Sequence, residues 1–174
     1  MGSNLRRVFV FLAACGLALS IVAYVASFSV PQSDTIFRWA IVLFPGWMVF
    51  YVSIFYLEYP SSKEPNFAWA GFARGMPSWV APCSCTLWLI FVAHLVWFGI
   101  RTGFGNPEIR DGQYALVTRW RILSVLSQAE YIKLRAVEAR MLAAAMITLY
   151  FMPAMYWWFR RDQASAPTPS TLKT

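Results

Sequence analysis

The sequence predicts an all-α polytopic membrane protein with four transmembrane helices and a small extramembrane hairpin or interfacial segment before the last, long helix. Four uncharged apolar stretches predict the spans, at residues 8–30, 39–57, 79–100 and 141–159. An α-helix rises about 1.5 Å per residue, so about 20 apolar residues cross the roughly 30 Å hydrocarbon layer of a bilayer. All 15 Lys and Arg and all 8 Asp and Glu lie outside these stretches. This is expected because a charged side chain is costly in the hydrocarbon layer.

Composition supports a membrane location and argues against nucleic-acid binding. The 174-residue chain is 59% apolar, above the roughly 45–50% of ordinary soluble domains. Its formal charge is +7, and cations beside a bilayer interact favourably with anionic lipid head groups. No basic run outside the spans resembles a nucleic-acid footprint. We therefore expect the lipid bilayer, and no nucleic acid, to be the partner of this charge.

The first span carries small residues on one helical face. These are Gly16, Ser20, Ala23 and Ser27, whose offsets of three and four residues place them on one side of a helix. Small residues let helix backbones approach closely in lipid, so this face predicts intramolecular packing or self-association. The apolar run exceeds the roughly 7–15 residues of a signal-peptide core, and we expect an uncleaved anchor.

The second span contains a helix-breaking pair. Pro45-Gly46 predicts a kink, because proline lacks the backbone donor and clashes with the preceding turn. A kink is preferred here to a ligand site, since no ionisable residue accompanies the pair. The following segment, 59–78, is aromatic in its second half and is expected to lie along the membrane interface.

His94 is the only ionisable residue inside a predicted span. It shares a helical stripe with Cys83 and Arg101. We expect a neutral imidazole that is hydrogen-bonded to a neighbouring helix, and His94 is a weak candidate for cofactor binding. The three cysteines, Cys15, Cys83 and Cys85, predict packing residues rather than a disulfide framework or a zinc site. No metal site and no catalytic residues are predicted.

The last span belongs to a longer helix with a capped beginning. Ser127 and Glu130 have the spacing of a capping box. In this motif the serine side chain accepts from the backbone N–H of the glutamate, and the glutamate side chain accepts from the backbone N–H of the serine. The helix is expected to run from Gln128 to Trp158, about 50 Å. Two to three turns would then project beyond the lipid, and Pro153 should bend the far half.

The extramembrane connection at 101–140 offers room for a specific surface. Its turn residues predict a loop, followed by two short runs at 113–118 and 121–126 that favour a β-hairpin turning at Arg119-Trp120. An amphipathic interfacial helix over the same residues is the alternative. We expect residues 1–161 to form a single transmembrane domain and 162–174 to form a disordered tail.

Charge leaves the orientation of the chain nearly tied. The Lys and Arg residues divide almost equally between the two sides of a four-span topology. Arg6-Arg7 and Arg160-Arg161 directly flank their spans, which favours cytoplasmic termini in a bacterial-type cytoplasmic membrane.

The sequence favours a non-catalytic accessory or interaction protein that binds other membrane proteins or lipid. Transport and catalysis normally require ionisable groups in a cluster or at membrane depth, and the sequence has no such cluster. Two alternatives stay open: a redox or cofactor-associated membrane subunit that uses His94, and a small transporter or channel that must oligomerise to enclose a path.

Overall fold

The computed structural model describes residues 3–29, 38, 46, 48, 51, 76–119 and 121–163. Within these residues the chain forms three helices and one three-stranded antiparallel sheet. In chain order the elements are α1 (Ser3–Ser29), α3 (Val80–Thr102), β1 (Asn106–Arg110), β2 (Gln113–Thr118), β3 (Arg121–Val125) and α4 (Gln128–Gln163). The three helices are each long and apolar enough to cross a membrane.

The prediction of an all-α protein with four spans is therefore wrong. In the described part of the chain three helices, not four, are candidate spans, and residues 106–125 form a sheet. The predicted span 39–57 lies outside the described residues except for Gly46, Met48 and Tyr51. Those three positions are each helical. The expected interfacial segment up to residue 75 and the expected tail from residue 164 also lie outside the described residues.

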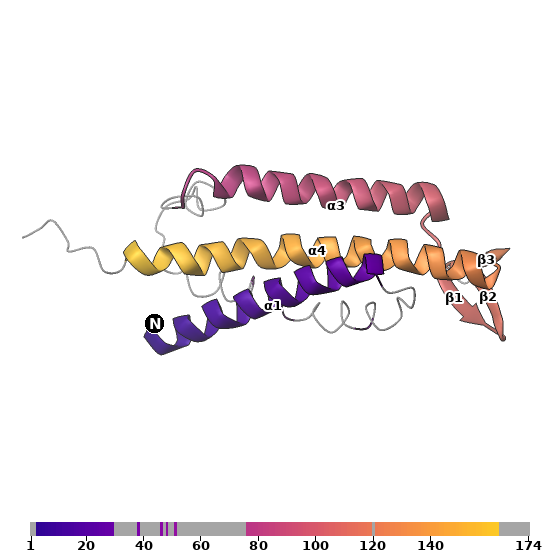
Figure 1. Ribbon diagram of the computed structural model, residues 1–174, viewed down its shortest axis with the longest axis horizontal. Coiled ribbons are helices and arrows are strands. Elements are labelled where there is room, and N and C mark those ends of the chain that lie inside the picture. Colours follow the sequence, from indigo (N-terminus) through magenta and orange to yellow (C-terminus); the bar gives the residue numbers. More distant parts are fainter. Residues whose placement is uncertain are drawn as a thin grey trace, which may run out of the picture.

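Helix α4 is the central element of the fold. It packs against both α1 and α3 and runs in the opposite direction to them (Figure 1). The sheet lies at the end of the molecule where α1 and α3 finish and α4 begins (Figure 1). Helix α4 continues through Pro153. The first turns of α4, the ends of two other helices and the sheet are thereby brought together.

The small-residue face of α1 is the surface that packs on α4. Ala13 and Ser20 are fully buried there, and Gly16 lies against the ring of Tyr150. A Cβ at Gly16 would lie only 2.6 Å from Cδ1 of that ring. The Ser20 hydroxyl donates to the carbonyl of Gly16 at 2.7 Å, which satisfies its polarity within its own helix. Close approach of the two helices therefore depends on small side chains on α1.

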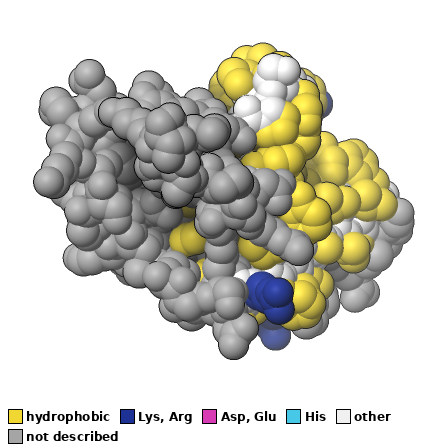
Figure 2. All heavy atoms as spheres, turned by 90° about the vertical axis from the view of Figure 1, so that its left-hand side faces the viewer, with side chains coloured by type: hydrophobic (Ala, Val, Ile, Leu, Met, Phe, Trp, Pro, Cys, Tyr) yellow, Lys and Arg dark blue, Asp and Glu magenta, His cyan; other side chains and the backbone are white. Residues whose placement is uncertain are grey.

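Helix α3 exposes far more apolar surface than α4. Leu89 and Ile100 are 70% and 72% exposed, and hydrophobic side chains make up most of the described surface that is visible at the end opposite the sheet (Figure 2). The contact of α3 with α4 includes a hydrogen bond from the Thr148 hydroxyl to the carbonyl of Leu87 at 3.3 Å. Such exposure suits a lipid environment, where apolar surface needs no protein cover.

The sheet consists of two hairpins that share β2. Between β1 and β2, Asp111 and Gly112 both have positive φ, at 52° and 78°, which is the type I′ geometry that Asp-Gly favours. Strands β2 and β3 form the antiparallel hairpin favoured by the sequence, with an irregularity in register at Leu116/Val117. Sequence patterning missed β1, because proline is rare in strands. Pro107 is tolerated since β1 is an edge strand.

Candidate functional site

The capping residues fix where α4 begins. The Ser127 backbone N–H donates to Oε2 of Glu130 at 2.9 Å, and the Glu130 backbone N–H donates to Oγ of Ser127 at 3.3 Å. The hydrogen bond from the Ser127 amide is the first cause of a lowered pKa of the Glu130 carboxyl. Tyr114 of β2 contacts Tyr131 with ring centroids 4.9 Å apart, so the sheet rests on this capped turn.

A cavity of about 530 Å³ lies beside this part of α4, between the ends of α1 and α3. Three cationic residues line it: Arg101 from α3, and Lys133 and Arg140 from α4. The remaining lining comes from Ser27 and Phe28 of α1, Trp97 of α3 and apolar side chains of α4. We call this space the cationic cavity; its volume is typical of ligand-binding sites.

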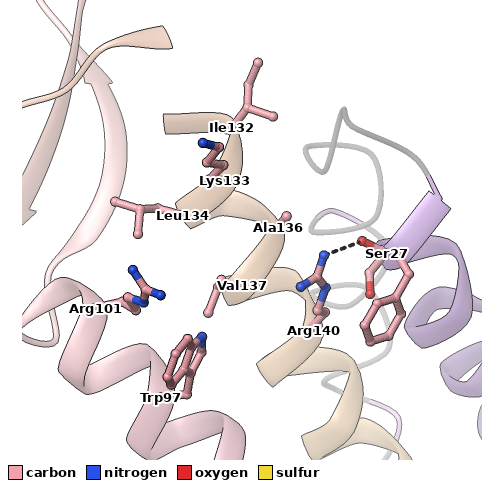
Figure 3. A pocket seen from close by; sticks show the side chains of 10 residues that line it. Ser27, Trp97, Arg101, Ile132, Lys133, Leu134, Ala136, Val137 and Arg140 are labelled. Atoms are coloured by element: carbon pink, nitrogen blue, oxygen red, sulfur yellow. Dashed lines mark hydrogen bonds between the residues drawn. The ribbon is translucent and has the colours of Figure 1, made fainter. Parts of the chain in front are cut away.

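Each arginine of the cationic cavity is held against an aromatic ring. The guanidinium carbon of Arg101 lies 4.5 Å from the ring centroid of Trp97, and that of Arg140 lies 4.4 Å from the ring centroid of Phe28. These are cation–π distances. Figure 3 shows Arg101 on one side of Val137 and Arg140 on the other, where Nη2 of Arg140 faces the carbonyl of Ser27 at 3.4 Å.

No carboxylate of the described residues lines the cationic cavity. Two nearby carboxylates of α4 are engaged elsewhere: Glu130 binds Ser127, and Glu138 pairs with Arg135 at 2.7 Å. The Nε atom of Arg140 is buried and has no hydrogen-bond partner among the described residues. The cavity therefore presents three cationic side chains, Arg101, Lys133 and Arg140, which is the chemistry of an anion site.

His94 lies about one helical turn further from the sheet than Trp97 and links α3 to α1. Its Nδ1 lies 2.8 Å from the carbonyl of Ile90, and its Nε2 lies 3.3 Å from the hydroxyl of Tyr24. A carbonyl only accepts, so Nδ1 carries the proton and Nε2 accepts from the Tyr24 hydroxyl. Both ring nitrogens thus have a hydrogen-bond partner.

Strand β3 forms an exposed edge of the sheet. All five of its residues are exposed, and no strand in the described part of the chain pairs with its outer side. The Leu126 N–H donates to the Tyr114 carbonyl at 2.8 Å. Since backbone groups alternate in direction along a strand, the N–H of Val125 points outward. Ile122, Leu123 and Val125 are between 52% and 65% exposed, so this edge lacks the usual cover.

The structure separates the site residues expected from sequence into distinct places. Gly16, Ser20, Ala23 and Ser27 follow the face of α1 toward α4, whereas Ser127 and Glu130 lie at the sheet. The three cysteines are free, and no cluster of metal-ligating side chains occurs among the described residues. Sequence reasoning missed the cationic cavity, whose only signal was a basic residue at the edge of two spans, Arg101 and Arg140.

Comparison with known proteins adds no assignment: the chain matches no family model, no curated protein and no solved structure at a significant level. The functional argument therefore depends on the geometry of the described residues alone.

Proposed function

We propose that this protein is a non-catalytic accessory protein of a bacterial-type cytoplasmic membrane, which binds a second membrane protein through the outer edge of β3. Three helices that are long and apolar enough to cross a membrane would anchor it. The uncovered strand edge is the observation that carries the proposal, because free backbone donors and acceptors beside exposed apolar side chains are a template for an added strand.

The position of β3 favours a partner at the membrane surface. Residues 128–140 of α4 contain five charged side chains, so lipid is expected to begin near Met141. At 1.5 Å per residue, this charged part of α4 projects about 20 Å. The sheet packs against its first turns. A segment paired with β3 would therefore lie outside the lipid head groups, within reach of the extramembrane part of a neighbouring membrane protein.

The other edge of the sheet does not offer the same template. Strand β1 contains Pro107, which lacks a backbone donor and is fully buried. Proline on an edge strand blocks pairing with further strands. The sheet can thus accept an added strand at one edge only, and a bound segment would pair with β3.

The arrangement of the helices also fits an orientation. The beginning of α1 and the end of α4 lie at the end of the molecule opposite the sheet (Figure 1). We place these ends in the cytoplasm, because Arg6-Arg7 and Arg160-Arg161 flank the apolar segments there. The β3 edge then faces outward. We expect a membrane-impermeant reagent applied to intact cells to label a cysteine that replaces Arg119. The same reagent should not label a cysteine that replaces Ser165.

Photocrosslinking tests the proposed edge. Leu123, which is 53% exposed, is replaced by p-benzoylphenylalanine in cells that make the full-length protein. Irradiation is expected to give an adduct with a different membrane protein, identified by mass spectrometry. In a Val125→Pro background the adduct should fall by about fivefold, since one outward hydrogen bond of about 1 kcal/mol is lost.

Val125→Thr is the matched control, because it keeps the backbone donor and the β-branched shape. It should preserve the adduct. If Val125→Pro proves misfolded by circular dichroism, Ile122→Lys supplies a second test, since an edge lysine opposes strand addition. An adduct that contains only this chain, or one that is unaffected by both variants, would contradict the proposal.

The cofactor alternative is less well supported by the geometry. A ligand role for His94 requires a free ring nitrogen, and its two nitrogens face Ile90 and Tyr24. The channel alternative stays a prediction, to be tested by ion flux in vesicles that contain the purified protein.

A further inference from the structure

We infer that the cationic cavity binds a phosphate group, most directly the head group of an anionic phospholipid. Arg101, Lys133 and Arg140 reach this space from two helices. Guanidinium and ammonium groups are the side chains that recognise phosphate oxygens. The inference is independent of the partner proposed for β3, because it concerns other residues and a different class of ligand.

Neutralisation of the helix ends accounts for only part of this charge. Arg140 faces the Ser27 carbonyl in the last turn of α1, and Arg101 lies in the last turn of α3. The C-terminal end of a helix carries about half a negative charge. Two such ends therefore match about one of the three cations. About two positive charges remain, and in the part of the chain that the structure describes no carboxylate lines the cavity to offset them.

Both arginines that line the cavity lie over aromatic rings. Stacking on Trp97 and Phe28 restricts each guanidinium to one face of its ring, so less conformational entropy is lost when an anion binds.

The position of the cavity favours a lipid as the source of the phosphate. It lies where α1 and α3 end, with Trp97 beside it, and tryptophan is typical of the head-group level of a bilayer. Basic pockets between transmembrane helices are known phospholipid sites. The hydrogen bond between Tyr24 and His94 joins α1 and α3 on the side away from the sheet. An acyl chain would leave over the exposed apolar surface of α3.

Native mass spectrometry of the full-length protein in detergent tests this inference. Phosphatidylglycerol and phosphatidylcholine with identical acyl chains are titrated separately. The wild-type protein should retain one phosphatidylglycerol with at least about tenfold preference. Arg140→Gln and Arg101→Gln should each weaken that preference by about fivefold, as expected for one cation near a lipid surface. Arg140→Lys should keep most of it.

Arg119→Gln is the matched control, since Arg119 is an exposed cation in the turn after β2 and does not line the cavity. It should leave the lipid preference unchanged. An equal loss in this control, or no preference in the wild-type protein, would overturn the inference. If Arg140→Gln does not fold, Arg101→Gln and Lys133→Gln decide the test, because both side chains are exposed.

Competition with inorganic phosphate tests whether the cavity recognises the phosphate group itself, whether it belongs to a lipid or to a free ion. Millimolar phosphate should displace phosphatidylglycerol from the wild-type protein but have no effect on the lipid that remains bound to Arg101→Gln. This result would show that the cavity recognises the phosphate group. Sulfate at equal ionic strength should compete similarly, whereas chloride should not. Displacement by chloride to the same extent would show only general screening and would contradict a built site.

Discussion

Replacing Gly16 by alanine tests whether the contact between α1 and α4 depends on the missing side chain. A Cβ at this position would lie 2.6 Å from Cδ1 and 2.8 Å from Cζ of the Tyr150 ring, whereas ordinary contacts begin at 3.4 Å. Tyr150 is 3% exposed and belongs to the cluster formed by Ala13, Met146 and Ala154. The ring therefore has little room to move, and the helices must separate.

The expected loss of stability combines two opposing effects. Overpacking of a well-packed core costs about 1–3 kcal/mol. Alanine is favoured over glycine inside a helix by about 1 kcal/mol. We therefore expect Gly16→Ala to reduce the free energy of unfolding by up to about 2 kcal/mol, measured by SDS titration in mixed micelles with circular dichroism.

The sign of this effect should depend on Tyr150. Tyr150→Ala alone removes a buried ring and should cost about 3–5 kcal/mol. In that background, Gly16→Ala no longer meets the ring and should stabilise the protein by up to about 1 kcal/mol. Ala18→Leu, on an exposed position of α1, is the control and should change stability by less than about 0.5 kcal/mol. Equal effects of Gly16→Ala in both backgrounds would refute the reasoning.

Two further predictions concern the polar contacts of the helices. Because the pKa of Glu130 is lowered, its carboxylate stabilises the start of α4 at neutral pH, and this contribution is lost as pH falls through the folded-state pKa. The protection factor of the Tyr131 amide, which is its exchange rate corrected for the intrinsic rate at each pH, should therefore fall in acid. Glu130→Gln should abolish this pH dependence of the protection factor. The same pH dependence in wild type and variant would contradict the prediction. Tyr24→Phe should destabilise the protein by about 1–2 kcal/mol, because Nε2 of His94 loses its donor. Nitrogen NMR should show the Nδ1–H tautomer of His94 in the wild-type protein, and the Nε2–H tautomer would contradict this assignment.

Local signals in the sequence predicted more than the overall fold class. The apolar lengths at 8–30, 79–100 and 141–159 coincide with described helices, since membrane solvation selects such segments directly. The spacing of Ser127 and Glu130 anticipated the start of α4, because capping acts within one turn. Strand β1 escaped prediction, since Pro107 opposes strand structure except at an edge, and edge position is a property of the finished sheet.

The candidate sites were hidden for a related reason. The small face of Gly16 and its neighbours indicated packing, but nothing in the sequence says which helix supplies the partner. The cationic cavity unites Ser27, Arg101 and Arg140, which lie far apart in the chain. Their meeting depends on how two helices end beside a third, and one sequence contains no covariation from which to infer that contact.

The central place of α4 has a consequence for biosynthesis. Helix α4, which packs against both α1 and α3, is the last of the described helices in chain order and therefore the last of the three to leave the ribosome. Until then, Gly16 and the other small residues on this face of α1 have no α4 to pack against, and the described contact between α1 and α3 includes the hydrogen bond between Tyr24 and His94. In a chain truncated before residue 139, α1 and α3 would therefore reach the bilayer without the helix that they both pack against. We expect membrane quality-control proteases to degrade such a chain.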